Sequence, residues 1–514
     1  MRTDLEDAVD PTAGDDADGD WADRTASDSD PRRIRLANGG AIVFEEDGFR
    51  LIRSRGLRRS PVHSYASLTH VCLAARALLI GTTRGLLVVR SRDFVDAATG
   101  PAQARERLIG RAALLPDGPA HLRAMARVEA LSSRPSRLGS IWATAALCLI
   151  GTAFQLRDPL LDQIGSFVPE LFGRGELWRG ITAHFLHALP AEPGRVESWI
   201  PGLRGLPIHL AINVGGLFVL GPLVERPMGR HRTMLVLLLG GLGTIAGILL
   251  AGHHEVVGAS GLVAALAGAI LALELHHPER VPAEWRLPRR LFVVAVALQF
   301  GLIDPLMRSF IAGGAHLGGF VGGYLAAWWL GVADVGPDPA SRRLRFAAHA
   351  GLVSAAALSL GIVPLARHDP AALERHAARL LDTPIAPHLF LHENAAAWLL
   401  ATEGHASPEG IEMAIALADR AVLTTDRMLP GILDTLAEAL FQSGDRFGAL
   451  LTIEEAIRLA PRERYFAEQR RRFTGERDAN DRPPEPGTRT PAESPFEWGD
   501  GSPLFDPDAP QITL

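Results

Sequence analysis

Long apolar segments fill the middle of this chain and separate two polar ends. They cover about residues 138–155, 206–224, 233–252, 259–275, 291–303, 312–332 and 346–366. A helix rises about 1.5 Å per residue, so roughly 20 apolar residues span a bilayer, and most of these segments approach that length. The fifth is short. The pattern predicts a mainly α-helical, polytopic membrane protein.

Arginines in alternate loops indicate the orientation of these spans. They precede the first segment and lie between the second and third, the fourth and fifth, and the sixth and seventh: Arg134, Arg137, Arg226, Arg230, Arg232, Arg280, Arg286, Arg289, Arg290, Arg342, Arg343 and Arg345. Basic loops favour the cytosolic side, so we expect a cytosolic N-terminus in the inner membrane of a bacterium. If the seventh segment, residues 346–366, spans the membrane, the region after it is extracytoplasmic.

The residues before the first apolar segment divide into two predicted regions. Residues 1–32 are rich in aspartate and glutamate and are expected to form a disordered tail, because they cannot bury enough apolar surface to fold. Residues 33–130 contain β-forming runs such as "GAIVFEEDGFRLI", followed by a helical stretch. We predict a small cytosolic β-rich domain with a linker helix, similar to pleckstrin-homology-like barrels. An unrelated α+β module fits the pattern equally well.

Residues 370–475 have the composition of a soluble helical domain. Ala449, Ile453, Ala456 and Pro461 follow the spacing of a tetratricopeptide repeat, and the segment before them looks like a degenerate copy. Because two repeats are few for independent stability, an atypical helical pair is the alternative. Residues 476–514, rich in Pro, Asp, Glu and Gly, are predicted to be a second disordered tail.

Composition narrows the possible chemistry. The formal net charge of −6 gives no indication of nucleic-acid binding, and two cysteines, Cys72 and Cys148, argue against a disulfide framework. The chain contains no lysine, so all 52 of its basic Lys and Arg residues are arginine. A Ser–Lys catalytic dyad is therefore excluded.

Four polar residues fall at the start of three spans that all run from the outer face inward. His209 and Asn213 open the second span, Ser260 opens the fourth, and His316 opens the sixth. A residue four positions into a helix lies only about 6 Å below its start, so these side chains can converge in one shallow extracytoplasmic pocket. Each alone has a structural explanation in helix packing. Ionisable groups within spans are nevertheless functional candidates, and their shared depth favours a site.

The motifs around these residues resemble those of the rhomboid family of intramembrane serine proteases. The resemblance rests on "LWRGITAHFLHA", "HLAIN", "GASG" and "AHLGGFVGG", and covers roughly residues 138–335. It implies a core of six transmembrane helices, with residues 346–366 as a seventh. It also implies a substrate that is a transmembrane protein.

The same resemblance implies the roles of individual residues. Ser260 is expected to be the nucleophile and His316 its general base and then acid. His209, Asn213 and the backbone N–H of Ser260 are expected to form the oxyanion hole. The residues that match supporting positions of the family motifs are Trp178, Arg179, Gly258, Gly261, Gly319 and Gly323.

Peptide hydrolysis by a serine nucleophile requires this combination of groups for physical reasons. A serine hydroxyl is a weak nucleophile until a base within hydrogen-bond reach takes its proton, and N–H donors stabilise the oxyanion that follows. Gly261 and Ala264 are predicted to meet Gly319 and Gly323, because small residues let helices approach closely. No carboxylate is evident in the sequence to orient His316, so we expect a Ser–His dyad without a third member.

Two features depart from the family pattern. Residues 188–205 form an unusual insertion between His187 and His209. Ala264 stands one turn after the serine, where better-studied members often have an aromatic residue that stacks on the catalytic histidine.

Other chemistries fit the sequence less well. "HHEVVG" has Gly258 where an HExxH zinc motif needs its second histidine, and Leu262 stands where a nucleophile elbow needs glycine. The histidine pairs 253–254 and 276–277 are predicted to be interfacial, since no cysteine or carboxylate frame accompanies them.

We therefore expect an intramembrane serine endopeptidase that needs no cofactor or metal. The expected partners are transmembrane protein substrates, membrane lipid and proteins bound by the tetratricopeptide-like domain, with no nucleic acid. The alternatives are a catalytically inactive rhomboid-like protein that binds membrane helices, and a transporter. A transporter predicts polar residues deep in the bilayer on broken helices, whereas these are shallow.

Overall fold

The computed structural model describes residues 32–37, 39–52, 60–133, 138–158, 160–188, 207–307, 311–332, 341–403 and 405–483. Nearly all of the first predicted tail, most of the second, and the insertion at 188–205 apart from Ala188 lie outside these ranges. The chain divides into two compact units, Met1–Arg134 with Pro278–Pro288, and Pro135–His277 with Arg289–Leu514.

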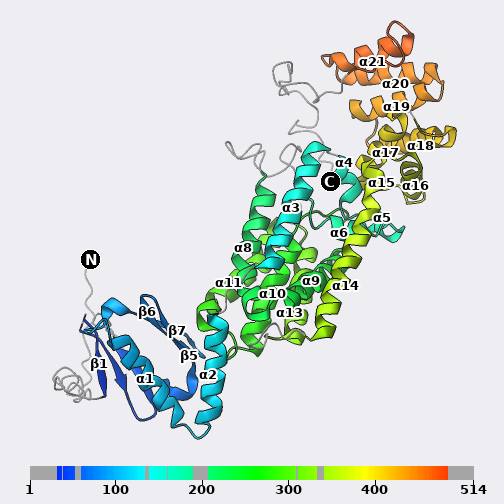
Figure 1. The fold of residues 1–514 in the computed structure, drawn as a ribbon. Helices are drawn as coiled ribbons and strands as arrows, with labels where there is room; N and C mark the ends of the chain where they lie inside the picture. Colours follow the sequence, from blue (N-terminus) through cyan, green and yellow to red (C-terminus); the bar gives the residue numbers. More distant parts are fainter. Residues whose placement is uncertain are drawn as a thin grey trace, which may run out of the picture. The chain divides into compact units, whose positions relative to one another are not determined.

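The first unit contains two antiparallel sheets packed with two helices (Figure 1). One sheet has the order β1-β2-β3-β4, the other β5-β6-β7. The elements are β1 (Arg33–Arg35), β2 (Ala41–Phe44), β3 (Gly48–Ile52), β4 (His63–Ser64), β5 (Leu68–Ala74), β6 (Ala77–Thr82), β7 (Gly85–Arg90), α1 (Gly100–Ala113) and α2 (Gly118–Ser132). The β-rich region predicted from the sequence is therefore present. Its likeness to a pleckstrin-homology barrel stays a prediction.

A loop between two apolar helices belongs to this first unit. Its 3-10 turn η4 (Ala283–Trp285) carries Glu284, whose carboxylate lies 2.8 Å from Nε2 of His70 and also accepts a hydrogen bond from Ser132. Arg286 donates to the carbonyl oxygen of Thr82 at 3.0 Å. These contacts fix the loop on the β-rich region.

The second unit contains the apolar helices. They are α3 (Gly139–Arg157), α8 (Ile208–Met228), α9 (Arg230–Ala251), α10 (Ser260–His276), α11 (Arg289–Leu298), α13 (Gly313–Leu330) and α14 (Arg342–Ser359). Among the described residues, α3, α8, α9 and the stretch Arg342–Ala366 are long and apolar enough to cross a membrane, and α10 is a shorter apolar helix. Many apolar side chains of these helices, such as Leu149, Leu242 and Trp329, are exposed on the protein, as expected where lipid replaces water, whereas α10 is mostly buried among its neighbours. The protein is therefore membrane-embedded.

Small residues set the spacing of α9, α10 and α13. A Cβ atom at Gly318 would overlap the carbonyl group of Gly243 on α9, and one at Gly319 would overlap that of Gly261 on α10. Gly323 packs in the same way on Ala265, not on Ala264 as the sequence analysis expected. The helices therefore touch backbone to backbone, as is common where glycines line an interface in membranes.

The fifth apolar segment is interrupted rather than simply short. After α11, a π-helical turn η5 (Gln299–Ile303) leads into the short α12 (Asp304–Leu306). Such π-turns shift the direction of later side chains and often occur at functional sites. Here the turn places Asp304, which is only 5% exposed, beside α13.

Residues 160–188, which follow α3 and which the sequence predicts at the outer face, are called the outer segment; they contain α4 (Leu160–Gly165), α5 (Pro169–Gly173) and α6 (Arg179–Thr182). Arg179 is fully buried and donates to the carbonyl oxygens of Gln163 and Ser166, each at 2.8 Å, and Trp178 donates to Ile164 at 3.0 Å. The side chains of Trp178 and Arg179 therefore hold this segment together.

After α14 the chain passes into a set of short helices (Figure 1). They are η6 (Leu360–Ile362), α15 (Val363–Ala366), α16 (Pro370–Leu381), η7 (Pro387–Leu389), α17 (Phe390–Thr402), α18 (Pro408–Thr424), α19 (Pro430–Gln442), α20 (Arg446–Leu459) and α21 (Arg464–Thr474). Ser407 and Asp445 cap α18 and α20 through their side chains. Leu171 and Trp178 of the α4–α6 segment share one hydrophobic core with Leu373 and Ala377 of α16.

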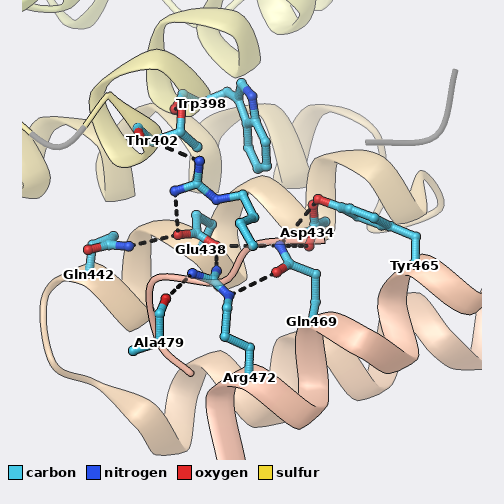
Figure 2. A network of polar contacts seen from close by, with 10 residues as sticks. Trp398, Thr402, Asp434, Glu438, Gln442, Tyr465, Gln469, Arg472 and Ala479 are labelled. Atoms are coloured by element: carbon cyan, nitrogen blue, oxygen red, sulfur yellow. Dashed lines mark hydrogen bonds and ion pairs between the residues drawn. The ribbon is translucent and has the colours of Figure 1, made fainter. Parts of the chain in front are cut away.

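A buried polar network joins α19 and α21 (Figure 2). Asp434 accepts hydrogen bonds from Tyr465 at 2.9 Å and Gln469 at 3.1 Å. Glu438 pairs with Arg472 and also accepts from Arg482 at 3.3 Å, which ties the last described residues to α19. The network is almost fully buried, so each member depends on its partners.

Candidate active site

The start of α10 brings three of the predicted residues together. Gly258, two residues before Ser260, has a φ of +118°, a conformation that favours glycine. A Cβ atom at this position would lie 2.8 Å from Nε2 of His209 and 3.7 Å from Nδ2 of Asn213. The imidazole and the amide of α8 therefore face the turn that leads into Ser260.

The hydrogen bonds of His209 define which of its nitrogens is the donor. The backbone N–H of Ala188 donates to Nδ1 of His209 at 3.1 Å. In the neutral ring the proton is consequently on Nε2, the nitrogen that faces Gly258. Asn213 uses one of its two amide hydrogens to bond the carbonyl oxygen of His209 at 2.8 Å. Two side-chain N–H donors thus lie near Ser260.

His316 lies on the helix that packs most closely on α10. Gly319, less than one turn after His316, meets the carbonyl of Gly261, which follows Ser260. The hydrogen bonds among the described residues do not include one between Ser260 and His316. Catalytic hydrogen bonds are often long without substrate and tighten only in the complex.

A small cavity lies beside Ser260. Its walls include Phe167 and His184 of the outer segment, Thr244 of α9, and Ala315, next to His316 on α13. Two further residues of its wall are hydrogen-bonded to each other, since the backbone N–H of Gly258 donates to the carbonyl oxygen of Ala183 at 2.8 Å. The cavity therefore lies where Ser260, the outer segment and α13 meet.

The expectation that no carboxylate orients His316 is wrong. Nδ1 of His316 lies 3.1 and 3.2 Å from the two carboxylate oxygens of Asp304, and Gln299 donates to Asp304 at 2.7 Å. With its proton held on Nδ1, a neutral imidazole keeps an unprotonated Nε2, which is the form a general base requires. Asp304 was not among the predicted site residues, although a lone acid beside a proline at the end of an apolar run was a usable signal.

Buried charges hold the outer segment in place. Glu176 is fully buried and contacts Arg179 at 2.7 Å, His376 at 2.6 Å and Arg379 at 3.0 Å. Burial opposes its charge, but His376 and Arg179 hold the pKa of Glu176 well below its ordinary value. Arg179 is always charged, so its part in lowering this pKa does not depend on the protonation of His376.

Comparison with known proteins gives one consistent family. Residues 204–333 match the family model of the Rhomboid domain. The chain is 28% identical over 217 residues to "Rhomboid protease GluP" of Bacillus subtilis, covering 41% of this chain and 36% of that protein. It is 30% identical over 158 residues to "Putative rhomboid protease YdcA" of the same organism, covering 30% of this chain and 67% of the relative.

A plant protein also matches. "RHOMBOID-like protein 6, mitochondrial" of Arabidopsis thaliana is 30% identical over 158 residues, covering 29% of this chain and 42% of that protein. The match to GluP thus spans about a third of that protein's length. No solved structure gives a significant match.

Proposed function

This chain belongs to the rhomboid family, and we propose that it is a serine endopeptidase that cleaves transmembrane segments of membrane proteins. The observation that carries the proposal is the convergence of His209 and Asn213 on the turn before Ser260, with an oriented His316 on the helix packed against it. Each group has the chemistry that one step of acyl transfer needs.

In the proposed mechanism, Nε2 of His316 takes the proton of the Ser260 hydroxyl as Oγ attacks the scissile carbonyl carbon. Asp304 stabilises the imidazolium that forms, since it accepts from Nδ1. His209, Asn213 and the backbone N–H of Ser260 donate to the oxyanion. His316 then gives its proton to the leaving amine, and a water repeats the sequence to release the acyl group from Ser260.

The substrate segment must be extended where it is cut. A helical carbonyl is already hydrogen-bonded within its own helix, so attack is easiest where small or helix-breaking residues let the segment unwind. The shallow start of α10 favours cleavage near the outer face of the membrane. Trp178, Arg179, Gly258, Gly261, Gly319 and Gly323 are proposed to support the site rather than to react.

The finer organisation is part of the same proposal. We assign a six-helix core to residues 138–335 and a seventh span to residues 346–366, with a cytosolic N-terminus and location in the bacterial inner membrane. The core shared by Trp178 and Leu373 supports an extracytoplasmic C-terminal region, because α14 must return the chain to the side of the α4–α6 segment. Residues 370–475 are proposed as a tetratricopeptide-like domain that binds protein partners.

The competing function is an inactive rhomboid-like protein that holds membrane helices. The lack of a hydrogen bond between Ser260 and His316 among the described side chains favours it. The presence of Ser260, His316, His209 and Asn213 together favours an active enzyme.

An active-site-directed fluorophosphonate separates the two. The purified protein in detergent is expected to be labelled, and Ser260→Ala and His316→Ala are expected to remain unlabelled while keeping the wild-type elution volume. Labelling of Ser260→Ala, or a folded wild-type protein that never reacts, refutes the protease assignment.

A further inference from the structure

The two histidines that precede the nucleophile have different environments. His253 accepts a hydrogen bond from the backbone N–H of Gly314 at 3.2 Å and so helps to fix the start of α13. His254 instead stacks on His388 of η7, with ring centroids 4.1 Å apart and planes 17° apart. A residue from the C-terminal helices thus reaches the segment between α9 and α10.

A carboxylate completes this group. Oε1 of Glu170, on α5, lies 3.2 Å from Nε2 of His388. One ligand atom from each of Glu170, His254 and His388 lies within 4.8 Å of the other two. The second carboxylate oxygen of Glu170 is buried and has no hydrogen-bond partner among the described residues.

These features are unusual for a simple ion pair and suit a cation. A buried carboxylate oxygen without a partner is unfavourable, and a bound cation satisfies it. Two imidazoles and a carboxylate are a ligand set typical of Zn²⁺ and related divalent transition metals. Ligand atoms around Zn²⁺ lie about 3.4 Å apart, given bonds of about 2.1 Å. The exposed His254 therefore has to shift and to turn out of its stacked position on His388 to complete the set.

We propose that Glu170, His254 and His388 form a binding site for a divalent transition metal of the Zn²⁺ class. The sequence did not reveal further ligands for His254, because Glu170 lies 84 residues before it and His388 lies 134 residues after it. The site goes beyond the proposed proteolysis and takes no part in its chemistry.

The position of the site gives it a structural consequence. His254 lies two residues before Val256, which pairs with Phe167 in a β-bridge, and four before Gly258. A metal held there joins three elements: the outer segment, the C-terminal helices, and the turn that carries Ser260. We infer that metal binding restrains this turn and holds η7 against it.

The test is metal binding by the full-length protein in detergent, with Ser260→Ala as the background so that catalysis has no influence. Chelator-treated protein is titrated with Zn²⁺ in competition with a chromogenic chelator. One equivalent is expected to bind at micromolar free Zn²⁺. His254→Ala and His388→Ala are each expected to weaken binding beyond the roughly 10–100-fold that loss of an outer-shell partner costs.

Two controls keep the result interpretable. His405→Ala removes an exposed histidine of the C-terminal region outside the cluster and is expected to bind like the parent protein. Amide exchange of residues 252–258 and 387–391 is expected to slow on Zn²⁺ addition in the parent and not in His388→Ala. Equal binding by the parent and both cluster variants, or no binding by a folded parent, overturns the site.

Discussion

Nδ1 of His316 lies 3.1 Å from a carboxylate oxygen of Asp304, and the carboxylate is almost completely buried. The pair joins α13 to the interrupted fifth apolar segment across the turn η5. This contact favours the tautomer that is protonated on Nδ1, and in the proposed mechanism that tautomer leaves Nε2 able to accept the proton of Ser260.

Replacing Asp304 by Asn is expected to reduce turnover. The Asn amide can donate its N–H to Nδ1 of His316 and so favour the tautomer protonated on Nε2, which cannot accept the serine proton. The equivalent change in serine proteases with a Ser–His–Asp triad lowers kcat by up to about 10⁴-fold. Cleavage of a reporter transmembrane substrate measures kcat, and KM is expected to change little. Glu279→Gln, an exposed acid elsewhere, is the control. Wild-type kcat in Asp304→Asn contradicts the orienting role.

Removing an oxyanion donor is expected to slow the chemical step. Asn213→Ala and His209→Ala are each expected to lower kcat by about 10²–10³-fold, because the N–H groups stabilise charge that appears only in the transition state. Ile212→Ala, an exposed neighbour on α8, is expected to retain activity. Single-turnover rates with the reporter substrate distinguish the variants, and equal loss in all three argues against the oxyanion assignment.

The turn at Gly258 is expected to tolerate no side chain. Gly258→Ala combines a φ of +118° with a clash against His209, and conformations of this kind cost on the order of 1–3 kcal/mol. Gly215→Ala, on α8 with open space at its Cβ position, is expected to be neutral or slightly stabilising. Thermal unfolding in detergent compares the two, and similar midpoints would mean that the turn relaxes freely.

The Glu176 cluster is expected to attach α16 to the outer segment in a pH-dependent way. Because the folded pKa of Glu176 is lowered, its stabilisation is present above the unfolded pKa near 4.5 and is lost as the pH falls below it. Glu176→Gln removes one partner of a buried ion pair, a change that typically costs about 3–5 kcal/mol.

Amide exchange of residues 370–381 measures this attachment. Exchange is expected to quicken in Glu176→Gln at neutral pH, whereas Glu409→Gln, an exposed acid, leaves it unchanged. Unaltered protection of α16 in Glu176→Gln shows that the shared hydrophobic core alone holds it.

Asp434 is expected to have the opposite pH dependence. Burial raises the pKa of Asp434 to about 7, although the hydrogen bonds from Tyr465 and Gln469 oppose this shift. The folded state therefore holds a proton that the unfolded state releases above about pH 4, and stability falls as the pH rises from about 4 to 7. The effect is at most on the order of 4 kcal/mol.

Proteolytic sensitivity of α19 and α21 in the full chain at pH 5 and pH 8 tests this dependence. Asp434→Asn is expected to abolish the difference, and Asp419→Asn, which is exposed, is expected to preserve it. A pH response that survives in Asp434→Asn assigns the titration to another group.

Local pattern predicted much of the fold. Apolar runs of near-bilayer length became helices, and the glycines near Ser260 and His316 predicted a close approach of α10 and α13. Both inferences depend on residues close together in the sequence, where helical periodicity determines which side chains share a face.

The sequence pattern did not predict contacts between segments that are far apart in the chain. Asp304 reaches His316 only because a π-turn redirects the chain, and His388 reaches His254 only because the C-terminal helices fold back on the outer segment. An apolar helix face indicates that something covers it, but a single sequence does not say what. The catalytic roles of Ser260, His209 and Asn213 stay predictions because their positions do not measure turnover.

The hydrophobic core shared by Trp178 of the outer segment and Leu373 of α16 has a further consequence for comparative work. Because each stretch buries apolar side chains of the other, substitutions in one are expected to restrict those tolerated in the other. A chimera that exchanges the C-terminal helices between relatives will have to carry the matching stretch from between α3 and α8 as well. Cutting the chain after α14 exposes this apolar surface on the outer segment, which is tied through the Phe167–Val256 bridge to the turn before Ser260.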